Sequence, residues 1–377
     1  MRRVYLDHNA TTPVDPRVLD AMLPFLRDDF GNPSSLHWFG QRARAAVEEA
    51  RASVAALVGA DPAEIVFTAS GSESDNMALR GATANAIAPH TGVACSAIEH
   101  HAVLNTAKAM RDEGLRAAIA RVDEHGVLDL ADLAAKVDDT TAVVSVMLAN
   151  NETGSLQPVP EAAGIARAHG ALVHCDAVQA AGKVPVDVRA LDADLLTLSA
   201  HKIYGPKGVG CLYVRRGTRM APLVRGGGQE RNRRAGTENV AGLVGFGVAA
   251  TLAREGLEGE SARLAALRDR LEGRLLAIPG TLRNGGEPRL PNTANLSFEG
   301  TESEALLIAL DLEGTAVSTG AACAAGGVEP SHVLRAMGLP PERVQSSLRL
   351  SLGRGTTEAE VDHAAEVITR AVARQRR

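Results

Sequence analysis

Short apolar runs alternate with helical patterns along the first two thirds of the chain. Strands are predicted where an apolar run is bounded by polar or turn-forming residues. These runs cover residues 4–6, 64–68, 93–98, 142–148, 171–175 and 194–198. Helices are predicted between them, at about 41–58 and after the turn at 69–74. Strands that alternate with helices are typical of a doubly wound α/β domain with a mainly parallel central sheet.

The last third of the chain has a different arrangement. Leucines recur at helical spacing from about 251 to 276, which predicts a connecting helix. Further strands are expected at 292–298 and 347–352, and the capping box Thr357-Glu-Ala-Glu360 begins a final helix. We therefore predict a large domain over residues 14–255 and a smaller α/β domain formed by residues 1–13 and 256–377.

Polar residues follow four of the predicted strands. They are His100, Asn150 with Asn151, Asp176 with Gln179, and Lys202. In open α/β sheets the carboxyl ends of the strands line the ligand site, so we expect these side chains to share one pocket. A single buried aspartate could equally be a paired structural residue.

Lys202 has the most suggestive position of these residues. It follows the apolar run 194–198, and Gly205, Pro206 and Gly208 force turns behind it. A lysine that is partly desolvated by such a turn has a lowered pKa and can act as a nucleophile or base. The alternative is an ordinary surface lysine in a Gly/Pro loop.

Two stretches could bind phosphate. Ser70, Gly71 and Ser72 precede a predicted helix, whose first N–H groups and partial positive charge suit an anion. Serines at this position are also common helix N-caps that bind nothing. The glycine-rich basic stretch 225–237 could likewise reach a phosphate or form a solvated turn.

The four cysteines contain no CxxC pair, so neither a disulfide framework nor a metal site is indicated. Cys95, Cys175 and Cys211 lie in strand-like apolar contexts and should be small buried residues. Cys323 differs, because the stretch 318–327 around it has no large apolar side chain to anchor it in a core. An accessible thiol is a good nucleophile, although an incidental small loop residue is the alternative.

Composition places few further limits on function. Apolar residues make up 45% of the 377-residue chain, charged residues make up 23%, and the net charge is −5. Interspersed charges of both signs argue against nucleic acid or an anionic membrane as the main partner. The N-terminus has no apolar signal region, and no later run was expected to approach a membrane span, so a cytoplasmic location is predicted.

Several motifs together resemble the cysteine desulfurases of the NifS/IscS type, which are fold-type I pyridoxal-phosphate enzymes. The motifs follow the order found in that family and extend over nearly the whole chain. They are YLDHNATT at 5–12, GNPSS at 31–35, ESDN at 73–76, NNETG at 150–154, DAVQ at 176–179, SAHK at 199–202, ACA at 322–324, EPSHVLR at 329–335 and RLSLGR at 349–354.

The resemblance implies a role for each polar residue around the cofactor ring. Lys202 would hold pyridoxal 5'-phosphate covalently and move protons at the substrate Cα. Asp176 would pair with the ring nitrogen, and His100 would stack on the ring and exchange a proton with the substrate thiol. Gln179 would bind the phenolic oxygen, and Asn151 would lie close to ring and substrate.

The resemblance also assigns the charged groups of cofactor and substrate. Gly71, Ser72, Ser199 and His201 would hold the phosphate, with Thr237 supplied by the other subunit of a homodimer. Arg349 would bind the substrate carboxylate, because a guanidinium can form two parallel hydrogen bonds with it.

The implied reaction converts L-cysteine to L-alanine and leaves the sulfur as a persulfide on Cys323. A protein acceptor would then take the sulfur, either an iron–sulfur scaffold or a tRNA-thiolation protein. The chain departs from the family in having alanines on both sides of Cys323, in having Ser72 where threonine is common, and in ending at Arg377 without the tail of housekeeping relatives. The acceptor is therefore left open.

Four other functions fit the same residues in part. A selenocysteine lyase, a kynurenine lyase or an aminotransferase on this fold would share the cofactor site. The non-enzymatic alternative is a sulfur-carrier or assembly scaffold with a vestigial cofactor site. Cys323 distinguishes the desulfurase from the first group, and bound cofactor distinguishes it from the scaffold.

Overall fold

The computed structural model describes residues 3–86, 90–319 and 330–377. Its centre is a seven-stranded sheet in the order β2-β8-β7-β6-β5-β3-β4. The strands are β2 (Ile65–Thr68), β3 (Gly92–Ser96), β4 (Ala117–Ala120), β5 (Thr141–Ser145), β6 (Leu172–Asp176), β7 (Leu195–Ser199) and β8 (Gly210–Val214). The pairs from β4 to β7 are parallel, and β8 is antiparallel to both of its neighbours. The predicted mainly parallel sheet is confirmed.

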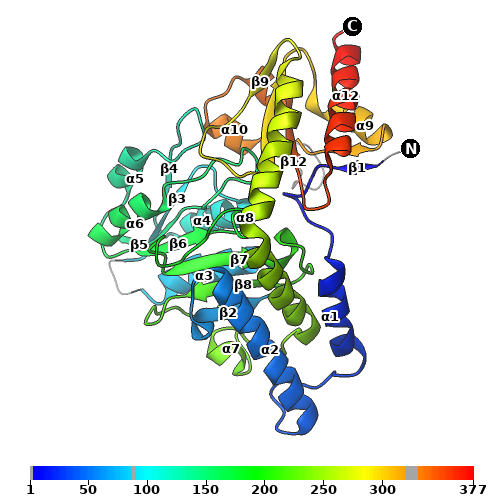
Figure 1. Ribbon diagram of the computed structural model, residues 1–377. Helices are drawn as coiled ribbons and strands as arrows, with labels where there is room; N and C mark the ends of the chain where they lie inside the picture. Colours follow the sequence, from blue (N-terminus) through cyan, green and yellow to red (C-terminus); the bar gives the residue numbers. More distant parts are fainter. Residues whose placement is uncertain (1–2, 87–89, 320–329) are drawn as a thin grey trace.

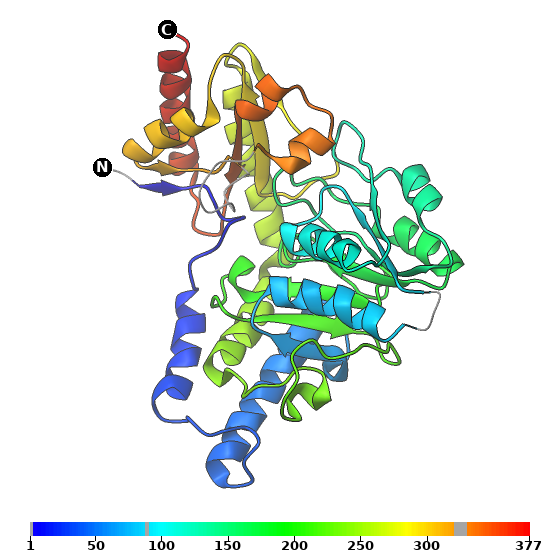
Figure 2. The same cartoon turned by 180° about the vertical axis from the view of Figure 1, so that it is seen from behind.

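Helices cover both faces of this sheet (Figures 1 and 2). On one face, α3 (Gly71–Ala84) and α4 (His101–Asp112) share an apolar core with β2, β3, β5, β7 and β8. The opposite face is covered by α2 (Trp38–Leu57), α6 (Val159–Ala168) and the first part of α8 (Val240–Leu276). Parallel strands buried on both faces need no polar alternation, which explains their continuous apolar runs.

A second apolar core lies in the C-terminal part of the chain. It is built on a three-stranded antiparallel sheet in the order β12-β10-β9, with α9 and α12 packed against it. Val4 and Leu6, from the start of the chain, belong to this second core, and β1 pairs in parallel with β11. The elements are β1 (Val4–Tyr5), β9 (Thr281–Arg283), β10 (Thr293–Phe298), β11 (Thr315–Ala316), β12 (Ser347–Ser351), α9 (Ser303–Leu312) and α12 (Glu358–Gln375). The domain boundaries themselves stay a prediction.

The remaining helices are short or lie at the edges of the two cores. They are α1 (Pro16–Arg27), α5 (Leu130–Lys136), α7 (Gln229–Asn232), α10 (His332–Ala336), α11 (Pro341–Gln345) and the 3₁₀ turns η1 (Pro62–Glu64) and η2 (Ala200–Lys202). Cys95, Cys175 and Cys211 are buried in the central sheet, as predicted. Cys323 lies outside the described residues.

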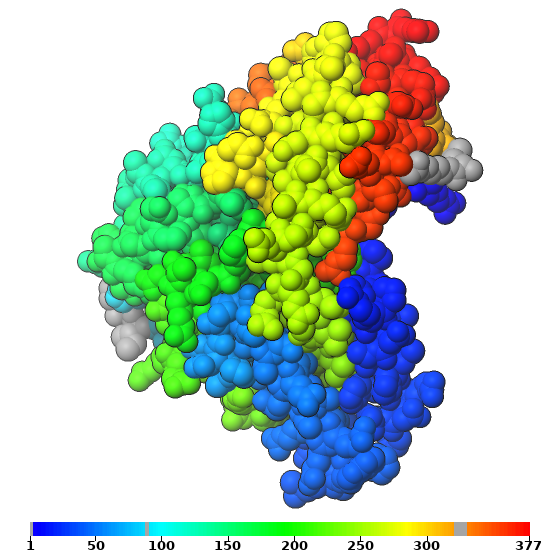
Figure 3. Space-filling model, in the orientation of Figure 1, coloured from blue at the N-terminus to red at the C-terminus, as the bar shows by residue number. Residues whose placement is uncertain are grey.

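The long helix α8 connects the two cores. Its first half packs Phe246 and Ala250 into the core under the large sheet, and its second half places Leu267 and Leu271 in the second core. Its side chains form a continuous yellow-green band between the two parts of the molecule (Figure 3). The predicted start near 251 is wrong, because the preceding Ala- and Gly-rich turns lack the leucine periodicity that was used to find the helix.

By length and composition alone, α8 could cross a membrane, which the sequence analysis did not expect. Half of its apolar window is buried inside the protein. Contact with α2 accounts for that burial, since Gly247 lies directly against the backbone of Ala50. The apolar composition of α8 is therefore that of a helix packed in the core of the protein.

The close contact between α8 and α2 gives a stability prediction. A Cβ atom on Gly247 would lie 2.6 Å from the Cα atom of Ala50. Gly247→Ala should therefore lower the free energy of unfolding by about 1–3 kcal/mol despite the better helix propensity of alanine. Gly259→Ala is the matched control in the same helix, where a Cβ atom meets nothing within 4 Å. We expect it to raise stability by about 0.5–1 kcal/mol. Urea unfolding measures both, and equal effects would contradict the account.

Candidate active site

Lys202 lies just past the carboxyl end of β7, in the turn η2. Its ammonium donates hydrogen bonds to the main-chain carbonyls of Asn9 and Ala10, at 2.5 and 2.7 Å. The N-terminal loop therefore passes over the lysine. Thr12 strengthens this contact, because its hydroxyl donates to the carbonyl of His201 at 2.9 Å.

Asn9 connects Lys202 with two other predicted site residues. Its carbonyl also accepts a hydrogen bond from Gln179 Nε2 at 2.9 Å, and its Nδ2 donates to the carbonyl of Asn151 at 3.1 Å. The side-chain oxygens of Gln179 and Asn151 are buried and have no hydrogen-bond partner among the described residues. Such unsatisfied acceptors indicate that a polar ligand belongs beside them.

Asp176 ends β6 and is buried, with 6% of its surface exposed. One carboxylate oxygen accepts from the N–H of Val178 at 2.9 Å. Burial raises the pKa of this carboxyl to about 6, and the Val178 N–H and the charge of Lys202 limit the rise. Asp176 is thus mainly ionised at neutral pH and can pair with a cation.

Behind Asp176 lies a buried polar group of residues that the sequence analysis missed. His174 hydrogen-bonds Ser145 and Thr197 through its two ring nitrogens, and Asp75 lies 3.6 Å from its Nε2. Burial lowers the pKa of His174 to about 3, so its ring is neutral. Burial and the charge of Asp176 raise the pKa of Asp75 well above its usual range. Burial thus disfavours charge on both His174 and Asp75, which lie near the Asp176 carboxylate.

His100 caps the N-terminus of α4, because its Nδ1 accepts from the N–H of Ala102 at 3.1 Å. Burial, followed by the charge of Lys202, lowers its pKa to about 4. A neutral ring with Nδ1 as acceptor carries its proton on Nε2. In this tautomer His100 can donate a hydrogen bond to a substrate atom.

Arg349 comes from β12 of the second core and reaches the same site. Its guanidinium donates to Asp7 Oδ1 at 2.7 Å and to the carbonyl of Asn151 at 3.1 Å. Its Nε is buried and has no partner among the described residues. The arginine is therefore oriented by the N-terminal loop and still has a donor for an anionic ligand.

Ser70, Gly71 and Ser72, which were predicted to bind phosphate, lie at the start of α3. The hydroxyl of Ser70 is occupied as the helix cap, accepting from the N–H of Glu73 at 3.1 Å. For Ser70, the N-cap alternative describes the observed contact. Gly71 lies close to the sheet, since a Cβ atom there would lie 3.1 Å from the Val178 side chain. Ser72 is exposed, and Ser199 is buried at the end of β7.

The two other predicted phosphate residues differ in position. His201 lies beside Lys202, and its Nδ1 is 3.0 Å from the Thr11 hydroxyl. Burial and the charge of Lys202 lower its pKa to about 4. Thr237 instead lines a separate hollow with Phe67 and Arg234. The structure does not bring Thr237 to the Lys202 pocket of its own chain.

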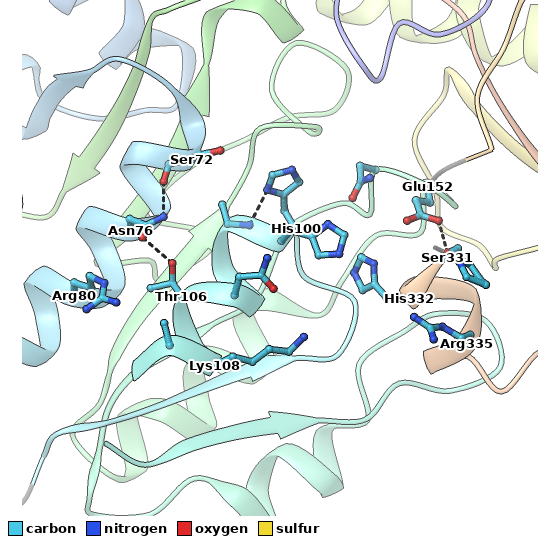
Figure 4. A pocket seen from close by; sticks show the side chains of 16 residues that line it. Ser72, Asn76, Arg80, His100, Thr106, Lys108, Glu152, Ser331, His332 and Arg335 are labelled. Atoms are coloured by element: carbon cyan, nitrogen blue, oxygen red, sulfur yellow. Dashed lines mark hydrogen bonds between the residues drawn. The ribbon is translucent and has the colours of Figure 1, made fainter. Parts of the chain in front are cut away.

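A groove of about 1010 Å³ leads away from His100 and Asn151. Figure 4 shows α3, α4 and α10 contributing side chains to its walls. Ser331 and His332 on the far wall belong to the EPSHVLR motif at 329–335, but no role was assigned to them from the sequence. Ser331 donates to Glu152 at 2.5 Å, and the ring of His332 bonds the carbonyl of Glu99 at 2.9 Å. These roles depend on partners that lie far away in the chain.

Glu99 is a further residue that the sequence analysis did not select. It is fully buried, and one oxygen accepts from Ser96 Oγ at 2.6 Å and from the N–H of Met147 at 2.8 Å. Burial raises its pKa from 4.5 to about 8. Glu99 is therefore a neutral acid at pH 7, next to His100 in the chain.

The raised pKa of Glu99 predicts a pH effect on stability. Between about pH 4.5 and 8 the native carboxyl binds a proton that the unfolded one has lost, so stability should fall as the pH rises. Glu99→Gln removes this contribution. We expect the variant to gain stability relative to wild type as the pH is raised from 5 to 8, in urea unfolding at several pH values. A difference between the two proteins that does not change with pH would contradict the account.

The chain is similar in sequence to known proteins over nearly its whole length. The family model for class-V aminotransferases matches residues 4–363. The chain is 49% identical to a cysteine desulfurase of Nostoc sp. over 100% of this chain and 94% of that protein, and 48% identical to the cysteine desulfurase NifS of Azotobacter vinelandii with the same coverage.

Solved structures agree with these relatives. A NifS-like protein superposes with a TM-score of 0.93 at 39% identity, covering 99% of this chain and all of that one. The structure of SspA in complex with cysteine gives a TM-score of 0.83 at 34% identity, covering 93% of this chain and 99% of that one. The chain therefore belongs to the class-V aminotransferase family and, within it, to the cysteine desulfurases of the NifS type.

Proposed function

We propose that this protein is a pyridoxal-phosphate-dependent cysteine desulfurase. It releases L-alanine from L-cysteine and passes the sulfur through Cys323 to a protein acceptor. The observation that supports this most is the set of side chains around Asn9. A lysine, a carboxylate and an arginine lie there beside two buried amide oxygens that have no hydrogen-bond partner in the described parts of the chain.

The residues present fit the cofactor. The unpartnered oxygens of Asn151 and Gln179 need polar neighbours, and Asp176 is largely ionised and able to pair with a protonated ring nitrogen. Lys202 would hold the aldehyde, and the cradle of Gly71, Ser72, Ser199 and His201 would hold the phosphate. When bound there, the cofactor supplies an electron sink for the negative charge that develops at the substrate Cα.

Lys202 and His100 move the protons in this proposal. The Lys202 amine takes the proton from the substrate Cα once the substrate amine has displaced it. His100 is neutral and carries its proton on Nε2, so it can donate a hydrogen bond to the substrate sulfur. The same histidine would lie against the cofactor ring, and its place at the N-cap of α4 fixes its orientation.

Arg349 selects the substrate by its carboxylate. Both of its terminal nitrogens are already engaged, with Asp7 and with the Asn151 carbonyl. Nε is still available, and Nη2 carries two N–H groups, of which Asp7 needs one. This edge of the guanidinium can bind the two oxygens of a carboxylate together, which favours a ligand that offers both.

Cys323 gives the most direct test of the activity. Its thiolate attacks the substrate sulfur, the bond from Cβ to sulfur breaks, and the carbon fragment leaves with that electron pair and is protonated to alanine. After incubation with L-cysteine, mass spectrometry should find one added sulfur atom on the peptide that contains Cys323. Cys323→Ala should lose at least about 100-fold in sulfide release, whereas Cys211→Ala, a buried-thiol control, should retain activity.

The alternatives predict other products. An aminotransferase or a kynurenine lyase would remain active in Cys323→Ala, and a selenocysteine lyase would act on selenocysteine in preference to cysteine. A scaffold without cofactor would be colourless and would form no alanine. Full activity of Cys323→Ala would contradict the proposal.

We also infer that the protein works as a homodimer. Large apolar side chains are exposed along α1, the loop after it and the first turn of α2, a concentration typical of an interface. They are Leu19, Leu23, Leu26, Phe30, Leu36, Trp38 and Phe39. Thr237 would then complete the phosphate site of the partner subunit. Sedimentation equilibrium should give twice the chain mass, and a monomer at micromolar concentration would contradict this inference.

A further inference from the structure

A second lysine is buried behind Lys202. Lys183 is 7% exposed, and its ammonium donates one hydrogen bond, to the carbonyl of Gln179 at 2.9 Å. Lys183, Lys202 and His8 line one cavity of about 30 Å³, which is separate from the large groove. The mechanism above gives Lys183 no role.

The charged groups around this cavity do not neutralise Lys183. Glu260 lies at the cavity but is paired with Arg263 at 3.0 Å, and Arg354 is paired with Asp15 at 2.8 Å. Within the described parts of the chain, no carboxylate lies within the 4.0 Å that defines an ion pair with Lys183. Lysines are rarely buried to this extent without a partner, because desolvation of the charge is costly.

Apart from Glu260, which is paired with Arg263, the titratable groups that line this cavity are neutral or positive. Burial, followed by the charge of Lys183, lowers the pKa of His8 to about 4, and His8 Nδ1 has no partner among the described residues. Burial raises the pKa of Tyr204, so its hydroxyl stays neutral. The remaining neighbour is Lys202. Burial and the charge of Lys202 together lower the pKa of Lys183 to about 7.

The two amines also share a connected set of hydrogen bonds. Lys183 bonds the main chain of Gln179, and the side chain of Gln179 shares the Asn9 carbonyl with Lys202. Two positive charges held near each other in a medium of low dielectric repel strongly. Repulsion is reciprocal. A positive charge on Lys202 destabilises the charged form of Lys183, and a positive charge on Lys183 destabilises the charged form of Lys202 to the same extent.

We propose that Lys183 is a positioning residue whose ammonium, held behind Lys202, disfavours a second positive charge there and keeps the Lys202 amine available as a base. This inference rests on the proposed function, which makes Lys202 the lysine that holds the cofactor. A purely structural lysine would only support the turn at Gln179.

The test is a spectroscopic pH titration of the holoenzyme. Lys183→Met keeps the length of the side chain and removes the charge. We expect the apparent pKa of the bound cofactor's visible absorbance to rise by about one unit. The acidic limb of the pH–rate profile should move in the same direction. Lys207→Met is the matched control, an exposed lysine in the loop that follows Lys202, and should leave the titration unchanged. An unshifted titration in Lys183→Met, with or without a loss of thermal stability, would overturn the proposal.

A second measurement covers the case in which Lys183→Met does not fold. In wild-type protein labelled with ¹³C at lysine Cε, one buried lysine should titrate near pH 7 by NMR. In Lys202→Ala, that resonance should titrate at higher pH, because the neighbouring charge is gone. A resonance that does not move would overturn the inference. A colourless holoenzyme preparation would instead count against Lys202 as the cofactor lysine, so the two failures are distinguishable.

Discussion

The carbonyl oxygen of Asn9 is the acceptor around which this site is built. It accepts hydrogen bonds from Lys202 and from Gln179, which come from consecutive strand ends of the large sheet. The side chain of Asn9 is bonded to Thr293 and Asn292 of the second core. One residue of the N-terminal loop therefore fixes groups from both parts of the molecule. The contacts of Asn9 with Gln179, Thr293 and Asn292 are buried, so losing one of them leaves polar groups unsatisfied at a cost of about 1–3 kcal/mol each.

The second core serves the site by holding the N-terminal loop and Arg349 in register. β1 pairs with β11, and Asp7 forms a bridge with Ser351, two residues after Arg349 in β12. This pairing brings the Asp7 carboxylate to the Arg349 guanidinium. The helix α8 keeps both cores at a fixed separation, because its two halves are buried in different cores. The arginine can therefore reach over the strand ends of a sheet to which it does not belong.

The buried titratable groups of the site differ in whether they carry a charge. Glu99, His100 and His174 are neutral at pH 7, and the pKa of Asp75 is raised, because burial opposes the charged forms of all four. Asp176 keeps its charge more easily, since it receives the Val178 N–H and faces Lys202. The charged groups of the pocket are the Asp176 carboxylate, the amine of Lys202, and the ion pair of Asp7 with Arg349.

Much of this arrangement could be predicted from local sequence. Apolar runs identified the strands, and the polar residues after them identified Lys202, Asp176 and His100, because strand ends meet at one sheet edge. Asn9, Asp75 and Glu99 were missed, since their importance comes from partners far away in the chain. The start of α8 was missed because close packing at Gly247 requires small residues rather than a leucine repeat. The roles given to individual residues, and the position of Cys323, stay predictions.

The central claim is that the amine at position 202 holds the cofactor. The most direct measurement is borohydride reduction of the holoenzyme, followed by proteolysis and mass spectrometry of the tagged peptide. The account predicts that the cofactor is fixed to Lys202, with Lys183 and Lys207 unmodified. A tag on Lys183 or another lysine, or no tag on any peptide, would contradict it.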